Sequence, residues 1–331
     1  MREAEEIFEG TGINITTEGR KYLGGYVGTR EGAEAYVNEL QEKWLQELNE
    51  LTKIAMSEPQ AAYAAFTSGF RHKVTYYMRT IPNLEGVLKP LDKFIDEHFI
   101  PAITEGHICS NDDRKLLSLP ARLGGMGIPI FTESCTREFE NSLQMTETLR
   151  NNIVAQEAIY IHNRRAENAI THKMDTDRKK REETLLEDLR TRMSKSQIRG
   201  NDVAQMKGAS AWLTSLPLKR EGYVLNKREF FDAVALRYRW VLKRLPSNCV
   251  CSEKFTMDHA MDCKTGGYIH RRHDRLRDLF ADLLDEVAYD VCTEPGLQPL
   301  SGEVLPPGTN TQDDARSDVA ARGFWQAFVL A

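Results

Sequence analysis

A cluster of potential metal ligands constrains the local fold of this chain more than any other feature. Three cysteines and one histidine fall within fifteen residues: Cys249, Cys251, His259 and Cys263. This set matches the number and type of ligands at a structural, tetrahedral Zn²⁺ site. Bound zinc contributes on the order of 10–16 kcal/mol to the folding of such small segments, so it can order a loop that has almost no core.

Two features leave the ligand set open. The Cys-x-Cys spacing is short, because two or more intervening residues are commoner at structural zinc sites, so the thiols can instead be incidental. His270 or His273 follows closely and can replace one ligand. Disulfides are not expected, because the acidic amino terminus has no signal-peptide pattern and a reducing, intracellular compartment (nuclear or cytoplasmic) is favoured.

The composition indicates a folded protein with more than one unit. A length of 331 residues allows two or three domains, and 41% hydrophobic residues permit substantial cores. No apolar run approaches the ~20 residues of a membrane-spanning helix, so no membrane partner is expected, and no small-molecule substrate is evident. The net charge of −5 gives no overall basic field. Binding to DNA or RNA must therefore use local basic patches.

Most of the first half of the chain has helical periodicity. Apolar residues repeat at three and four positions over Val37–Ala55, which predicts an amphipathic helix that ends before Pro59. Pro59 suits the first turn of a second helix that continues to Met78, and a third helix is predicted over about residues 84–104. Together these patterns predict a helical bundle over residues 31–170.

The segments on either side of the bundle differ from it in composition. Within residues 1–30, β-prone runs around Ile13–Thr16 and Tyr22–Val27 predict a hairpin with its turn at Glu18-Gly19. Residues 171–225 carry dense charge of both signs, which is typical of solvated helices or a linker. We expect a domain boundary there.

A basic helix is predicted just before the ligand cluster. Asn226 and Glu229 form a capping-box pattern at its start, and its apolar face is expected to run from Phe231 to Leu245. Cations crowd its later turns, namely Arg237, Arg239, Lys243 and Arg244. These four residues are candidates for contact with nucleic-acid phosphates.

A second basic cluster lies at the start of the amphipathic helix that follows the ligands. Its arginines are Arg271, Arg272 and Arg275. Cations at a helix start oppose the macrodipole at a cost of about 0.3–1 kcal/mol each, which indicates a need for positive charge there, such as phosphate binding. The alternative is a solvated basic face whose charge Asp274 and Asp278 partly neutralise.

The order of several short motifs resembles a known family. After the ligand cluster come Gly266-Gly267, Arg271-x-His273, Glu294-Pro-x-Leu297, Asp313-x-Ala-Arg-x-Asp318-Val and Gly323-Phe-Trp325. This order is similar to the carboxy-terminal part of LINE-type (non-LTR) retrotransposon proteins, in which a CCHC zinc knuckle precedes a restriction-like, PD-(D/E)XK-type endonuclease. Four upstream segments resemble the region just past a reverse transcriptase palm, with its thumb and connecting helices: Lys21–Gly24, Pro59–Phe66, Arg79–Pro82 and Leu119–Gly125.

The resemblance implies a mainly α chain that ends in a truncated α/β, nuclease-like part. The implied parts are a palm-edge-like hairpin (1–30), a thumb-like or connection-like helical bundle (31–170), charged linker helices (171–225), a basic helix with the zinc knuckle (226–265) and an incomplete endonuclease domain (266–331). It further implies DNA or RNA as the partner and structural Zn²⁺ as the cofactor.

The departures from the family limit the activity that we expect. Asp318 and Glu294 match acidic catalytic positions, but the family places a second acid and a base on the following strand, where this sequence has only Gln326–Ala331. Mg²⁺ is expected only if that site were completed. Neither Asp112-Asp113 nor Asp313-Asp314 lies in a polymerase Tyr-x-Asp-Asp turn. We therefore expect a catalytically inactive, nucleic-acid-binding fragment; the alternative is a host-retained, zinc-containing binding or scaffold protein.

Overall fold

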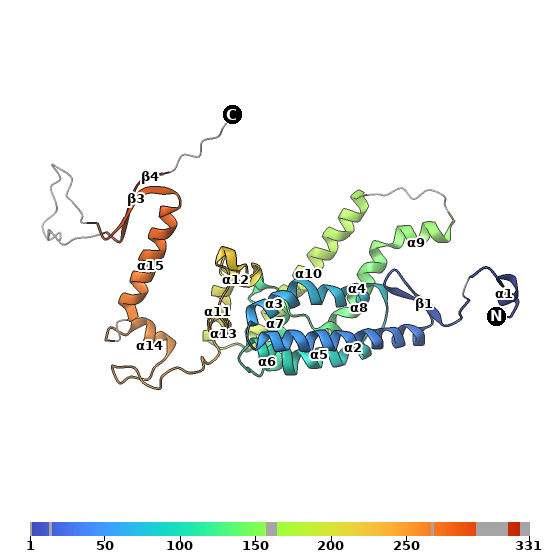
Figure 1. Ribbon diagram of the computed structural model, residues 1–331, viewed down its shortest axis with the longest axis horizontal. Coiled ribbons are helices and arrows are strands. Elements are labelled where there is room, and N and C mark those ends of the chain that lie inside the picture. The colour runs from blue at the N-terminus through green and yellow to red at the C-terminus, as the bar shows by residue number, and fades with distance from the viewer. Residues whose placement is uncertain (1, 13–14, 157–163, 266–267, 296–316, 325–331) are drawn as a thin grey trace, which may run out of the picture. The chain divides into compact units, whose positions relative to one another are not determined.

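The computed structural model describes the chain except for residues 1, 13–14, 157–163, 266–267, 296–316 and 325–331 (Figure 1). The described residues are mainly helical, as the periodicity predicts, with two small antiparallel sheets of two strands each. The chain divides into a first unit, residues 1–242, and a second unit, residues 243–331. The Gly266-Gly267 motif, the Asp313-Asp314 pair and the segment from Trp325 onward lie outside the described residues.

Helix α2 (Arg30–Ala55) contributes buried side chains along its whole length to the core of the first unit. The Thr29 side chain caps it by accepting a hydrogen bond from Gly32 N (3.1 Å). The predicted apolar stripe is confirmed, because Val37, Trp44 and Leu48 are fully buried. A short helix α1 (Arg2–Ile7) precedes α2 in the sequence.

Two further helical stretches pack against α2, and each contains a π-helical turn. The first runs through α3 (Pro59–Ala65), η1 (Phe66–Phe70) and α4 (Arg71–Thr80), and the second through α5 (Glu85–Phe94), η2 (Ile95–Phe99) and α6 (Ile100–Ile103). These bounds confirm the helices predicted to begin at Pro59 and near residue 84. Phe66 and Phe99 stack between the two stretches with ring centroids 4.7 Å apart.

The Gly/Pro-rich segment around residues 119–130 is a loop, as its composition predicts, with one short 3₁₀ turn η3 (Ala121–Leu123). It follows α7 (Asn111–Ser118), whose buried Arg114 pairs with Asp96 and donates to the carbonyls of Ile128 (2.8 Å) and Pro129 (2.8 Å). Gly125 is required here, because a Cβ at that position would lie 1.9 Å from Leu119 O.

The remaining helices of the first unit follow this loop, and several of them add buried residues to its core. They are α8 (Phe131–Met145), α9 (Glu147–Val154), α10 (Arg164–Arg192), α11 (Lys195–Gln205), α12 (Ala211–Thr214), the 3₁₀ turn η4 (Lys219–Glu221) and α13 (Lys227–Tyr238). Leu186 and Leu189 near the end of α10 are buried in the same core as α2. The boundary expected within residues 171–225 is therefore absent from this unit, because those apolar positions anchor the charged helix.

The amino-terminal hairpin forms with a register different from the one predicted. Strands β1 (Gly19–Tyr22) and β2 (Gly25–Gly28) pair antiparallel, with Tyr22 opposite Gly25. The turn is Leu23-Gly24, not Glu18-Gly19, and both turn residues have positive φ (47° and 83°), as tight two-residue hairpins require.

The second unit contains α14 (Met257–Asp262), α15 (Tyr268–Asp285), β3 (Ala288–Thr293) and β4 (Val319–Phe324). Strands β3 and β4 pair antiparallel with an irregular register, and α15 packs against both. These elements form a small helix–strand–strand arrangement. Across the described part of the chain, no helix combines the length and the apolar character needed to cross a membrane.

Replacing Asp92→Ala should lower the free energy of unfolding of the first unit by about 3 kcal/mol, since buried N–H groups would lose their acceptor. The buried Asp92 carboxylate accepts hydrogen bonds from Phe131 N (2.9 Å), Thr132 N (2.9 Å) and Thr132 Oγ1 (2.7 Å), and thereby caps α8. Urea unfolding followed by tryptophan fluorescence measures the change. Glu97→Ala, at an exposed ion pair of 3.9 Å, is the control, and an equal effect of both variants would contradict this role.

Candidate metal centre and nucleic-acid interface

Cys249 and Cys251 lie in a tight hairpin at the start of the second unit. Asn248 pairs with Lys254 in an isolated antiparallel bridge, and Cys249 N donates to Glu253 O (2.8 Å). Ser252 adopts a positive φ of 71° that reverses the chain. The short Cys-x-Cys spacing is therefore accommodated by a turn that directs both thiols to one side.

His259 and Cys263 come from α14 and its C-terminal end. Thr256 caps this helix, and its hydroxyl accepts from His259 N (3.1 Å). Cys263 is the C-cap residue, and its N–H donates to His259 O (2.8 Å). The spacing of four residues places both side chains on the same face of one helical turn.

The four potential ligand atoms converge, all within 4.8 Å of one another. Cys249 Sγ lies 3.6 Å from Cys263 Sγ, and Cys251 Sγ lies 3.2 Å from His259 Nε2. Ligands bonded to one tetrahedral zinc stand about 3.5–3.8 Å apart, given bonds of about 2.3 Å to sulfur and 2.1 Å to nitrogen. A disulfide needs sulfurs only about 2.05 Å apart, and all three cysteines are free thiols. The geometry and donor set therefore fit a metal such as zinc.

The other cysteines have the properties of isolated thiols. Burial raises the pKa of Cys109 to about 12 and also raises the pKa of Cys135. Such thiols remain protonated and act as small packing groups. Cys292 is exposed on β3. The three clustered cysteines therefore differ from the three isolated ones, and it is their clustering with His259 that identifies them as potential metal ligands.

Neither alternative histidine joins the ligand cluster. Among the described residues, the potential ligand atoms that converge are those of Cys249, Cys251, His259 and Cys263. His270 is exposed on α15, and His273 Nε2 lies 3.1 Å from Asp318 Oδ1 instead. The Cys₃His set is thus the one that the tertiary structure assembles.

The arginines at the start of α15 are largely accessible. Arg271 and Arg275 are exposed and lie one helical turn apart, and Arg272 is half-buried. Arg272 Nη1 contacts Met261 Sδ (3.5 Å) on α14, the helix that carries His259. Lys243 and Arg244, in the segment before the hairpin, are exposed as well.

Arg237, which the sequence predicted to bind phosphates, lies in the interior of the first unit. Arg237 is buried, and its guanidinium donates to the carbonyls of Ala121 (3.1 Å), Gly124 (3.2 Å) and Gly125 (3.2 Å) and to Ser210 Oγ (3.0 Å). Its role is to hold the Gly/Pro loop, which corrects the prediction of phosphate contact at this residue.

The helix that carries Arg237 is shorter than predicted. The capping box of Asn226 and Glu229 is confirmed, but α13 ends at Tyr238, because Arg239 takes a left-handed φ of 57° at the C-cap. Val241 is therefore exposed and does not extend the apolar face. Arg239 is half-buried, and its side chain packs near Gly200 of α11. The unit boundary after Leu242 separates α13 from the metal ligands.

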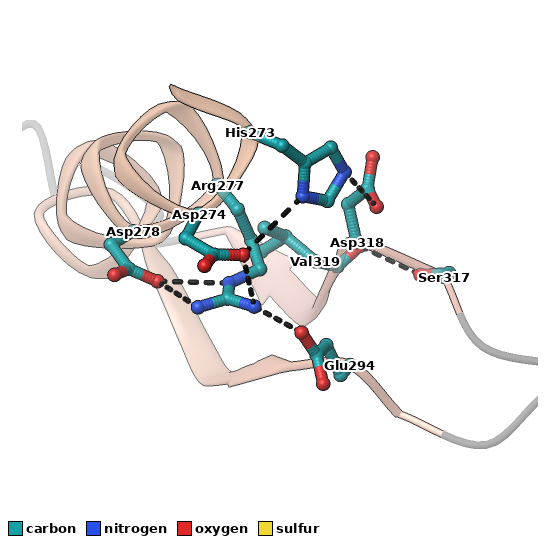
Figure 2. Close-up of polar contacts among 8 residues, drawn as sticks. All are labelled: His273, Asp274, Arg277, Asp278, Glu294, Ser317, Asp318 and Val319. Carbon is teal, nitrogen blue, oxygen red and sulfur yellow. Dashed lines mark hydrogen bonds and ion pairs between the residues drawn. The ribbon is translucent and has the colours of Figure 1, made fainter. Parts of the chain in front are cut away.

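Asp318 and Glu294 are neighbours in the backbone where β3 ends and β4 begins, and Figure 2 shows their side chains turned to different partners, Asp318 to His273 and Glu294 to Arg277. Glu294 N donates to Asp318 O (3.0 Å), and Ser317 N donates to Pro295 O (3.2 Å). The fold therefore brings together two acidic residues that are separated by 23 positions in the sequence. Both side chains are exposed to a large extent.

Residues of α15 complete this acidic end, and their place there was not predicted from the sequence. Figure 2 shows the Arg277 guanidinium between Asp274, Asp278 and Glu294, with Arg277 Nη2 2.8 Å from Asp278 and Nη1 3.5 Å from Asp274. The hydrogen bond that Arg277 donates to Asp278 raises the pKa of Arg277. His273 and Arg277 are four residues apart and therefore share one face of α15. This spacing was the only sequence pattern that could have predicted that both residues face the acidic end.

The Asp112-Asp113 pair has a structural role. Asp113 forms a capping box with Ser110 at the start of α7, and Asp112 pairs with Arg192 (3.0 Å). The carboxylates are therefore committed to a helix cap and an ion pair, not to a shared metal.

No family model matches this chain in a scan of known protein families, and searches of curated proteins and of solved structures likewise give no match.

The purified chain should contain about one Zn²⁺, as a four-ligand site requires. The double substitution Cys249→Ser/Cys263→Ser should abolish stoichiometric zinc, because only one thiol and one imidazole would remain. Metal analysis by mass spectrometry measures the content. The matched control is Cys109→Ser/Cys292→Ser, which removes two thiols outside the cluster and should leave zinc unchanged. Full zinc in the first double variant would refute the ligand assignment.

Proposed function

We propose that this chain is a nucleic-acid-binding part of a protein like those that LINE-type retrotransposons encode, with the helical first unit corresponding to thumb and connecting helices. The observation that carries the binding proposal is the Cys₃His cluster, which leads directly into a helix start with exposed arginines. The motif order described above supports the family. DNA or RNA is the proposed partner.

The metal centre gives the basic helix start a fixed position within the second unit. α14 contributes two of the four ligands and packs against α15, where Met261 contacts Arg272. Zinc bound to those ligands would make α14 a rigid support, since metal binding supplies folding energy to small segments. Arg271 and Arg275 would then be held in place for phosphate oxygens at little entropic cost.

The net charge of the chain makes this binding local and electrostatic. The overall charge is −5, so no long-range field draws a polyanion to the molecule. The proposed contacts are Arg271, Arg272, Arg275, Lys243 and Arg244, all within the second unit. Arg237 and Arg239 are left out of this set because they pack within the first unit.

The acidic end of the β3–β4 hairpin corresponds, in this proposal, to the beginning of a nuclease site. Asp318 and Glu294 are its acidic residues. Asp318 is paired with His273, and Glu294 with Arg277. A divalent cation such as Mg²⁺ requires several oxygen ligands, and Arg277 already neutralises the carboxylates around it. Bringing a metal here would require displacing that guanidinium or adding further acidic residues.

Binding to duplex DNA should weaken with salt. If the five basic residues neutralise phosphates, log affinity should fall linearly with log salt, by roughly 0.9 for each phosphate contacted. Arg271→Glu/Arg275→Glu should weaken binding about tenfold or more and reduce that slope, because two contacts would become repulsive. Fluorescence anisotropy with labelled DNA and RNA measures both quantities.

A matched control distinguishes a local site from general charge effects. Arg220→Glu reverses a charge on a side chain that is 95% exposed in the first unit, and it should leave affinity unchanged. An affinity that is insensitive to salt, or an equal loss in both variants, would contradict the proposed interface.

The chain alone should show neither DNA nicking nor primer extension. Glu294, Asp318, Asp112 and Asp113 are engaged by Arg277, His273, Arg192 and a helix cap, respectively. Loss of one member of a cooperative catalytic set typically costs several orders of magnitude. Plasmid nicking and primer extension with Mg²⁺ or Mn²⁺ test this. Nicking that disappears in Asp318→Ala would show that the nuclease site is functional.

A further inference from the structure

One face of α15 exposes an uninterrupted apolar surface. Leu276, Leu279, Phe280 and Leu283 are 61%, 55%, 61% and 52% exposed. Their spacing of three and four residues places them on one side of the helix, a set that we call the apolar stripe. Val287, just beyond the helix, extends the stripe and is 48% exposed. Contiguous apolar patches of this kind mark interaction sites, because exposing them to water is unfavourable.

The stripe is distinct from the face that packs within the unit. Arg277 and Ala281 are less exposed and lie on the side of α15 toward β3 and β4. Arg277 pairs with Glu294, which directly follows β3. The fold of the second unit therefore uses one side of the helix and leaves the apolar stripe beside it uncovered.

Charges along the edge of the stripe change sign from one end to the other. Arg271 and Arg275 lie in the first half of α15, and Asp282 and Glu286 lie at or just beyond its second half. A helical repeat of 100° per residue places these four on one edge of the stripe. Within the part of the chain that the structure describes, no salt bridge involves them, whereas Arg277 on the opposite edge pairs with three carboxylates.

We propose that two copies of this chain associate through the apolar stripe, with their α15 helices antiparallel. Twofold symmetry then places the same edge of each helix against that of the other copy, with its direction reversed. A twofold axis near Leu279 and Phe280 brings Arg275 of each copy opposite Asp282 and Glu286 of the other. The stripe is thus complementary to itself in both apolar character and charge.

A parallel pairing would lack this complementarity. A twofold axis along the helices would set this edge of one helix against the opposite edge of the other, where Arg277 is already paired with three carboxylates. α15 is about 27 Å long, at 1.5 Å per residue over its 18 residues. A single helix pair of this length lies at or below the low end of stable interfaces, which bury about 1,200 Å² or more in total, so the dimer should be concentration-dependent.

The inference does not rest on nucleic-acid binding, and it is tested on the zinc-loaded, full-length chain without nucleic acid. Sedimentation equilibrium over a wide concentration range should show a reversible monomer–dimer equilibrium. Phe280→Asp should raise the dissociation constant on the order of a hundredfold, because a central apolar anchor is lost on both copies. Ile108→Asp, at another exposed apolar residue, should have no effect.

Charge reversal tests the antiparallel orientation. Arg275→Glu alone, and Asp282→Lys/Glu286→Lys alone, should each weaken the dimer by about tenfold, since each creates like-charge contacts. The triple variant that combines them should restore the original affinity. In it, Glu at position 275 of one copy would face Lys at positions 282 and 286 of the other, so opposite charges would again lie together. Helical content by circular dichroism checks that α15 stays folded in every variant.

A monomer at all concentrations would overturn the proposal and would mean that another segment of the chain covers the apolar stripe. A dimer that Phe280→Asp leaves unchanged would place the interface elsewhere and would also overturn it. A dimer that the triple variant fails to restore would refute the antiparallel arrangement.

Discussion

Three thiols and one imidazole converge in the second unit, where they could hold a metal ion. Among its described hydrophobic residues only Cys263 and Ala288 are buried, so packing alone supplies little of the energy needed to order it. A metal bound by the Cys₃His set would offset that deficit, because ligand bonds replace apolar burial as the source of folding energy. Such a centre would fix α14 and, through the contact of α14 with α15, the arginines at the start of α15.

The first unit is stabilised in a different way. Its core is extensive, and its irregular Gly/Pro loop is held by two buried arginines, Arg114 and Arg237, which donate to loop carbonyls. Loops of this kind carry backbone acceptors that helices and sheets cannot satisfy, and a buried unsatisfied carbonyl is costly. A guanidinium with five donors can satisfy several of them at once.

Arginine therefore has three roles in this chain, and neighbouring atoms decide among them. Arg237 satisfies buried carbonyls, Arg277 neutralises three carboxylates, and Arg271 stays exposed. Each of these arginines has other basic residues near it in the sequence, so the local composition predicts the same role for all three. The three side chains differ in how far their charge is removed from water, and the surrounding fold alone determines that.

Local patterns in the sequence predicted the first helices of the bundle, the cap at Asn226 and the clustering of the four ligands, but the choice of His259 over His270 and His273 needed the tertiary structure. The periodicity of Val37–Ala55, the capping box at Asn226 and the Cys₃His spacing depend on residues near one another along the chain, where propensity and side-chain geometry act directly. The hairpin turn at Leu23-Gly24, the burial of Arg237 and the pairing of Glu294 with Arg277 were decided only by the tertiary structure. Those features depend on backbone and charge contacts between distant segments, whose free energies no local pattern records.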